Sequence, residues 1–165
     1  MLSLPHRSGS MCGALCVAAL HHLQGEGRRL AALGELVRVL RPGGRALVTA
    51  WALEQACPER TTEGAWRALE GGEYGDFLVG WATPVHRAVG PAAEAARALA
   101  EGRASAPEAA GASLDSSGRN VCWQRFYHLF REGEVEALVA RTPGAVLERA
   151  WLERSNWLAV ITKEV

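Results

Sequence analysis

Residues 28–51, RRLAALGELVRVLRPGGRALVTAW, predict a helix, a tight turn and a buried strand. Leucine and valine side chains recur at helical spacing in residues 30–40 and form one apolar stripe. Pro42-Gly43-Gly44 should end the helix, because proline blocks its continuation and glycine turns the chain without steric cost. Residues 46–51 then form the strand.

A second apolar run, residues 13–20, lies just upstream and ends in His21-His22. Together the two runs and the helix make a βαβ unit, in which the crossover is right-handed and the strands run parallel. Ligands of such sheets bind at the carboxyl ends of the strands, so we expect His21-His22 and Trp51 to lie side by side there. The run is apolar on both faces, which predicts helices on both sides. Its upstream edge would be bare unless another chain or an upstream segment covers it.

Composition describes an ordinary globular domain. The chain has 165 residues, of which 48% are hydrophobic and 22% charged. Its formal charge is zero, so RNA binding would need a local basic patch. The four cysteines form no C-x-x-C pair, so neither a zinc site nor a thioredoxin-like motif is indicated, and we expect no metal site. The cysteines fit an intracellular, reducing compartment. No apolar stretch reaches the roughly 20 residues that cross a bilayer, so we expect no membrane contact.

The middle of the chain predicts an excursion from the sheet over residues 56–119. Within it, DFLVGW at residues 76–81 is a short apolar patch, and residues 91–112 are alanine-rich and of low complexity. Pro91 would start a short helix and Gly102 would stop it. The stretch from Gly102 to Gly118 favours a flexible segment.

Order returns at Cys122, where FYHLFREGE at residues 126–134 leads into a short helix at about residues 132–140. Two further apolar runs, residues 145–151 and 157–162, suit a β-hairpin with a longer loop. The predicted fold class is therefore α/β: two parallel strands, a linker, a helix and a C-terminal antiparallel hairpin, in one partial domain.

Several motifs together resemble a known family. RVLRPGGRALVTAWALEQ, residues 38–55, resembles the fifth-strand region of S-adenosylmethionine-dependent methyltransferases. The order of six segments resembles the eukaryotic tRNA wobble-uridine carboxymethyl methyltransferases. The segments are LPHRSGS, the strand ending in His21-His22, residues 38–55, DFLVGW, FYHLFREGE and NWLAVITKE. The resemblance covers nearly all of the ordered chain.

In that family the enzyme uses S-adenosylmethionine to esterify the carboxylate of 5-carboxymethyluridine at the tRNA wobble position, and a small zinc-binding activator subunit assists. The resemblance implies a partial, Rossmann-like class I methyltransferase sheet, the C-terminal half with the family's fourth to seventh strands. It also implies tRNA and the activator as partners, and a location in the cytoplasm or also the nucleus.

The family's cofactor-binding glycine loop and its acidic ribose ligand have no counterpart in this sequence. GEGRRL at residues 25–30 is a near match, but its third position is leucine, and no acidic residue ends a strand about 20 residues on. Cys12 stands where the family has an aspartate. We expect weak binding of S-adenosylmethionine to this chain alone. A non-catalytic module that binds tRNA or protein, or a truncated gene product, stays an alternative.

The resemblance places His21 and His22 near the acceptor nucleotide, as the candidate catalytic residues. His21 would hydrogen-bond the substrate carboxylate, which is already anionic at pH 7 and needs little acid–base help. Positioning and a dry site would then carry most of the rate. The alternative is one buried, satisfied histidine beside a solvated one.

Candidate substrate-binding residues lie on the helix start and the later motifs. Arg28 and Arg29 would contact tRNA phosphates, or else form a solvated helix face. Trp51 would line the site or fill the core.

Tyr127 would stack on a base and Arg131 would face the anionic RNA. Asn156 would bind substrate or only shape the turn before the last strand. A rival chemistry pairs Cys16 with His21 or His128 as a nucleophile, although nothing orders a third group beside such a pair.

Overall fold

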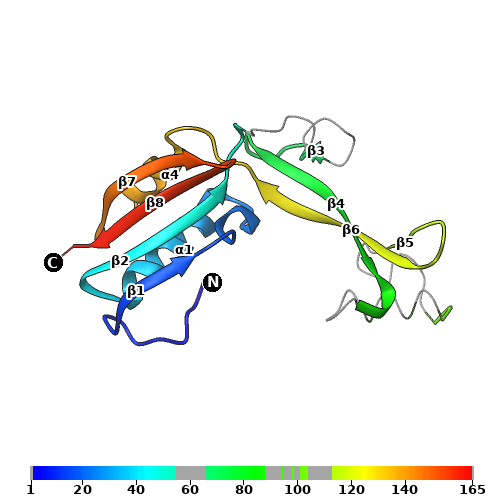
Figure 1. The fold of residues 1–165 in the computed structure, drawn as a ribbon, viewed down its shortest axis with the longest axis horizontal. Coiled ribbons are helices and arrows are strands. Elements are labelled where there is room, and N and C mark those ends of the chain that lie inside the picture. Colours follow the sequence, from blue (N-terminus) through cyan, green and yellow to red (C-terminus); the bar gives the residue numbers. More distant parts are fainter. Residues whose placement is uncertain are drawn as a thin grey trace.

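The computed structural model describes residues 2–54, 66–87, 94, 98, 101–103 and 113–164. These residues form two four-stranded sheets (Figure 1). The first sheet carries both labelled helices on one face, and the second is antiparallel and extends away from one end of the first (Figure 1). Among the described residues, no helix has the length and apolar character that a membrane-spanning segment needs.

The first sheet has the strand order β1-β2-β8-β7. Strand β1 (Met11–Cys16) runs parallel to β2 (Leu40–Trp51), and helix α1 (Glu26–Val39) connects them, so the predicted βαβ unit is confirmed. Strand β8 (Asn156–Lys163) pairs antiparallel with both β2 and β7 (Ala145–Glu153). The terminal hairpin is therefore confirmed, and its second strand lies between β2 and β7.

The segment Pro42-Gly43-Gly44 lies inside β2 and not between a helix and a strand. Helix α1 ends at Val39, and β2 begins with the next residue. Residues 41–44 bulge out opposite a single residue of β1, since the register steps from Met11↔Leu40 to Gly13↔Arg45. Gly43 has a φ of +71°, which glycine adopts freely. The sequence correctly located the break but misjudged its form, because a bulge and a turn require the same residues.

The first strand is shorter than predicted and is not covered on both faces. β1 ends at Cys16, and the last residue of the apolar run, Leu20, begins the 3-10 helix η1 (Leu20–His22). Leu15 is 75% exposed and Val17 is 58% exposed, whereas Cys16 is buried. Among the described strands, β1 pairs with β2 alone and forms the edge of its sheet. The predicted two-sided burial is therefore wrong for the described residues.

The core lies between the first sheet and its helices. The predicted stripe of α1 is confirmed, with Leu33, Leu36 and Val37 buried and Leu30 partly buried against them. Helix α4 (Glu134–Ala140) adds Leu138 to the same cluster and begins two residues later than predicted. Burial of these side chains is the main term that holds α1 and α4 on the sheet.

The second sheet has the order β3-β4-β6-β5 and was not predicted. Its strands are β3 (Trp66–Ala68), β4 (Asp76–Pro84), β5 (Ser113–Leu114) and β6 (Asn120–His128), and the short 3-10 helix η2 (Val85–Arg87) follows β4. The predicted patch DFLVGW forms the first six residues of β4, which pairs with β6 along its whole length. The excursion thus contributes β3, β4 and β5 to a sheet, and most of the alanine-rich segment lies outside the described residues.

The turn of the terminal hairpin is tighter than predicted. β7 extends to Glu153 and β8 begins at Asn156, so the turn contains only Arg154 and Ser155. Both turn residues have positive φ, 47° and 63°. Such a two-residue turn matches the twist of the strands it joins, and here it replaces the longer loop that the apolar runs indicated.

Candidate active site

His21 and Trp51 meet at the carboxyl end of β2. Helix η1 brings His21 against the strand end, where the Trp51 backbone N–H donates a 3.2 Å hydrogen bond to His21 Nδ1. Their ring centroids lie 4.9 Å apart. The predicted neighbourhood of these two residues is therefore confirmed, although the histidines follow β1 across a short turn and do not end it.

His21 is a neutral hydrogen-bond donor. Its side chain is 1% exposed, and burial, helped by the charge of His22, lowers its pKa from 6.5 to about 3. Because Nδ1 accepts the backbone N–H of Trp51, the neutral ring carries its proton on Nε2. His22 is exposed, and its Nδ1 lies 3.3 Å from the Phe126 carbonyl oxygen of β6.

Aromatic rings from both sheets surround His21. Tyr127 of β6 stacks on Trp51 at 4.9 Å with an interplanar angle of 11°, and it lies 4.6 Å from His22 and 5.4 Å from His21. Trp66 of β3 lies 5.6 Å from Tyr127. We call His21, His22, Trp51, Trp66 and Tyr127 the aromatic cluster. It joins the two sheets, and Tyr127, which is 2% exposed, stacks on a protein ring in this conformation.

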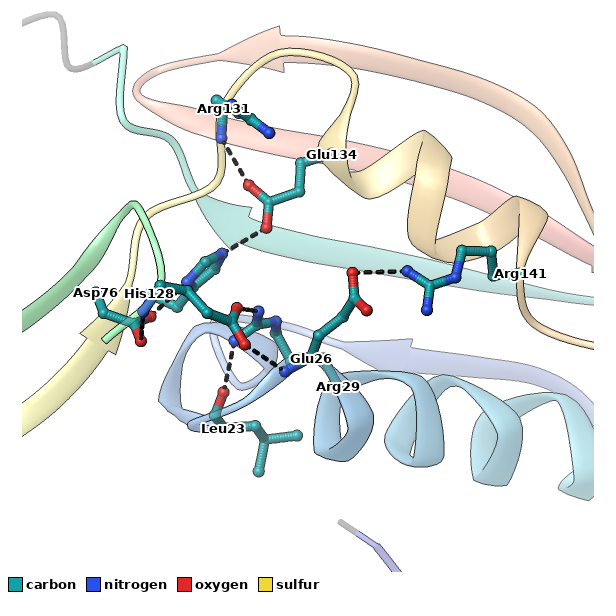
Figure 2. A network of polar contacts seen from close by, with 9 residues as sticks. Leu23, Glu26, Arg29, Asp76, His128, Arg131, Glu134 and Arg141 are labelled. Atoms are coloured by element: carbon teal, nitrogen blue, oxygen red, sulfur yellow. Dashed lines mark hydrogen bonds and ion pairs between the residues drawn. The ribbon is translucent and has the colours of Figure 1, made fainter. Parts of the chain in front are cut away.

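A polar network lies beside this cluster (Figure 2). His128 Nδ1 lies 2.6 Å from Asp76 Oδ1, and His128 Nε2 lies 2.5 Å from Glu134 Oε1. The other oxygen of Glu134 accepts the Arg131 backbone N–H at 3.2 Å. One buried imidazole thus links β4, β6 and α4.

Arg29 is buried inside this part of the structure. Its side chain is 1% exposed and donates a hydrogen bond to the Leu23 carbonyl oxygen at 3.1 Å (Figure 2). It also forms an ion pair with Glu73. Glu73 Oε1 also accepts the Glu26 backbone N–H at 3.0 Å. The guanidinium therefore lies neither on a solvated helix face nor on an accessible surface that RNA could contact, so both expectations for Arg29 are wrong. The physical reason is its pairing with the Glu73 carboxylate, which is 44 residues away in the chain.

Glu73, Asp76 and His128 are also a group whose ligand atoms lie within 4.8 Å of one another in the described part of the chain. A metal ion there would have to displace the hydrogen bonds of Asp76 and His128 and would face the charge of Arg29. We assign this group to the polar network around His128. Glu73, Asp76 and Glu134 were missed by sequence reasoning, since no local pattern marks them.

The remaining predicted residues are dispersed. Arg28 is exposed, and Arg131 is exposed with its guanidinium carbon 5.9 Å from the Tyr74 ring centroid. Asn156 is half-buried opposite Trp51, and its Nδ2 donates to the Arg154 carbonyl oxygen at 2.9 Å, which holds the hairpin turn.

The rival nucleophile is unsuited to its task. Burial raises the pKa of Cys16 to about 11, so its thiol stays protonated and weakly nucleophilic at neutral pH.

No protein-family model matches the chain. It is 33% identical over 164 residues to the tRNA (carboxymethyluridine(34)-5-O)-methyltransferase of Schizosaccharomyces pombe. The alignment covers 98% of this chain and 61% of that protein. It is 28% identical to alkbh8 of Xenopus tropicalis, an enzyme of the same name, over 98% of this chain and 28% of that protein. The enzyme of Saccharomyces cerevisiae is 28% identical, over 98% of this chain and 66% of its own length.

This chain is a homologue of the eukaryotic tRNA (carboxymethyluridine(34)-5-O)-methyltransferases. It spans less than two thirds of the length of these relatives. A methyltransferase of Methanosarcina mazei has a similar structure, with a TM-score of 0.60, 16% identity, and coverage of 99% of this chain and 64% of that chain. The 1,6-didemethyltoxoflavin-N1-methyltransferase of Burkholderia thailandensis has a TM-score of 0.52 to this chain at 15% identity. The superposition covers 99% of this chain and 48% of that enzyme. The methyltransferase fold class is thereby confirmed.

The fold family implies S-adenosylmethionine, and the near-match segment at residues 25–30 does not fit it. The first amide of α1, that of Glu26, is already bonded to the Glu73 carboxylate. A Cβ added at Gly25 or Gly27 would meet no atom within 4 Å, so no other part of the described chain packs closely against either glycine.

Proposed function

We propose that the chain supplies the acceptor side of an S-adenosylmethionine-dependent methyltransferase that esterifies the carboxylate of 5-carboxymethyluridine at the tRNA wobble position. The observation that carries the proposal is the neutral His21 donor held between Trp51 and Tyr127 at the carboxyl edge of the parallel strands. The names of the relatives support the choice of acceptor.

The chemistry of a carboxylate nucleophile suits this arrangement. A carboxylate is ionised at pH 7, so the site needs no general base. It needs a donor that fixes one oxygen while the other stays free to react. His21 Nε2–H would be such a donor once the acceptor displaces the rings that cover it, because His21 is 1% exposed in this conformation. The aromatic cluster would exclude water from the reacting oxygen and hold the base that carries it.

The proposed substrate follows from the names of the same relatives. Transfer RNA is the proposed substrate, and Arg28 and Arg131 are exposed arginines that suit its phosphates. A small zinc-binding activator subunit and a cytoplasmic, or also nuclear, location rest on the resemblance alone.

Two labelled anticodon stem-loop RNAs test the function, one with 5-carboxymethyluridine and one with uridine at the wobble position. A hydrogen bond to a charged group contributes about 1.5–3 kcal/mol, so we expect the carboxymethylated RNA to bind about 10- to 150-fold more tightly in fluorescence anisotropy. His21→Phe keeps a ring but removes the donor, and the preference should vanish. His86→Phe, an exposed residue of η2, is the matched control. Equal affinity of the wild-type chain for both RNAs overturns the proposal.

A binding module that acts through β1 is the second candidate. Leu15 and Val17 are exposed beside an edge of β1 that no described strand pairs with, which favours pairing with a strand of another chain. Light scattering that shows a dimer, which a Leu15→Lys variant loses, would support this candidate. A monomer over the whole accessible concentration range would exclude self-pairing.

A further inference from the structure

One face of the second sheet is aromatic along its length. Register pairs Phe77 with Tyr127 and Trp81 with Trp123, and it pairs Val79 with Trp66 on one side and Arg125 on the other. Residues directly opposite each other share a face, as do residues two apart in one strand, so all of these side chains lie on the same face. We call Trp66, Phe77, Trp81, Trp123, Arg125 and Tyr127 the aromatic face.

This face is continuous with the aromatic cluster that surrounds His21. Tyr127 belongs to both, and the ring of Trp66 lies 5.6 Å from Tyr127 and 5.9 Å from Phe77. From Phe77 to Trp81 the strand advances by about 13 Å at the usual rise per residue. Strands β4 and β6 extend away from the first sheet along this line (Figure 1).

The outer end of the face offers a ring and a cation to solvent. Trp81 is 40% exposed, and the Arg125 guanidinium carbon lies 4.5 Å from the Trp81 ring centroid. Neither side chain is buried, unlike Tyr127 at the inner end.

The exposed charge on this sheet has one sign. Strands β3, β4 and β6 carry four aspartate, histidine or arginine residues, of which Asp76 and His128 are buried and bonded to each other. The other two, Arg67 and Arg125, reach solvent, and neither has an ion pair within the described ranges. Arg125 belongs to the aromatic face, whereas Arg67 pairs with Leu78 and lies on the opposite face. Although the chain as a whole is neutral, Arg125 therefore gives the aromatic face a positive charge that an RNA phosphate can contact.

We propose that the aromatic face binds the nucleotides that flank the acceptor nucleotide, as a stacking surface for single-stranded RNA. The proposal rests on the proposed function, since it assumes that the acceptor base occupies the site at His21. Every base presents a π-face, so stacking on Trp81 tolerates any sequence, and Arg125 supplies a phosphate contact or stacks in turn.

The test compares two tryptophan variants of the whole chain on two probes. Trp81→Ala removes the exposed ring from β4, and Trp151→Ala removes a ring that lies 4.7 Å from the Arg149 guanidinium on β7, which makes it a matched control. The probes are the anticodon stem-loop with uridine at the wobble position and a labelled single-stranded oligouridine. Fluorescence anisotropy gives the Kd values, and circular dichroism melting checks that each variant is folded.

Trp81→Ala should weaken binding of both probes about 5- to 150-fold, which is the range for loss of one base–aromatic stack, and Trp151→Ala should leave Kd within about twofold. Trp81→Phe should restore most of the affinity. A folded Trp81→Ala variant that binds as well as the wild type overturns the proposal, and so does an equal loss in Trp151→Ala. A wild-type chain that binds neither probe also overturns it and makes a protein the alternative partner.

These outcomes are independent of the wobble carboxylate. If Trp81→Ala weakens binding but the wild type does not prefer 5-carboxymethyluridine, the stacking surface stands and the proposed function fails. If the preference exists but Trp81→Ala has no effect, the proposed function stands and the stacking surface fails.

Discussion

Glu73→Ala should destabilise the fold far more than loss of an exposed ion pair. Glu73 is the carboxylate partner of Arg29, whose side chain is 1% exposed. After the substitution the guanidinium keeps the Leu23 carbonyl oxygen as an acceptor, and its Nε has no hydrogen-bond partner among the described residues even in the wild type. The variant therefore leaves a buried cation without a counter-charge.

The magnitude follows from burial on the two sides of the pair. Removing one partner of a fully buried ion pair costs about 3–5 kcal/mol. Glu73 is 45% exposed, so water can enter the vacated space, and we expect a loss of about 2–3 kcal/mol in the free energy of unfolding. Loss of the acceptor for the Glu26 amide adds little, because that helix end can be hydrated.

Urea unfolding followed by tryptophan fluorescence measures this loss. Arg141→Ala is the matched control, because it breaks a 2.7 Å pair with Glu26 in which both side chains are about half exposed, and it should change stability by less than about 1 kcal/mol. Arg29→Met combined with Glu73→Ala removes both charges and should recover much of the loss. A Glu73→Ala variant as stable as Arg141→Ala would show that Arg29 is not held by this carboxylate.

The same pair predicts a pH dependence. Burial raises the pKa of Glu73, but hydrogen bonds from the Glu26 amide and Arg29 outweigh burial and lower it below 4.5. A lowered folded pKa means that this contribution is present above the unfolded pKa and is lost as pH falls below it. The acid loss of stability should therefore be shallower in Glu73→Ala than in the wild type, and parallel curves would contradict the pairing.

Three further predictions concern single residues. From about pH 7 to about pH 5 the wild type should lose about 2 kcal/mol more stability than His21→Phe, because the unfolded histidine takes up a proton near pH 6.5 and the folded one only near pH 3. If urea unfolding shows the same pH dependence of stability in both proteins, this prediction is wrong. Gly75→Ala should lower the free energy of unfolding in urea by about 2–4 kcal/mol, because φ is +96° and the new Cβ would lie 2.5 Å from the Leu129 carbonyl oxygen. Gly80→Ala, with open space around its Cβ, should be nearly neutral, and a similar cost for both variants would contradict the geometry. Iodoacetamide should alkylate the exposed Cys12 in the native chain and Cys16 only after unfolding, because burial raises the pKa of Cys16 to about 11; tandem mass spectrometry that finds native Cys16 modified would disprove this.

Sequence patterns worked where one local segment carried the whole signal. The helical spacing before Pro42 predicted α1, and the apolar runs at the end predicted the β7–β8 hairpin. The position of Trp51 beside His21 followed from a general rule for parallel strands, and the structure confirms it. The order of short motifs also identified the methyltransferase family, which the relatives confirm.

Patterns failed where a short strand or a single charged residue depends on distant partners. β4 looked like an isolated apolar patch because its pairing partner, β6, lies more than 30 residues further along the chain. Trp66 joined the aromatic cluster from a segment without any clear period.

What the amino-acid sequence by itself determined was the βαβ unit, the terminal hairpin and the family, because hydrophobic spacing and turn residues act over a few neighbouring positions. Only the tertiary structure decided that Arg29 is buried against Glu73 and that His128 bridges Asp76 and Glu134. Arg29 and Glu73 lie 44 residues apart, and His128 and Asp76 lie 52 apart, so no local period encodes either contact. Chain folding places these partners together, and burial then makes their charges and hydrogen bonds important for stability.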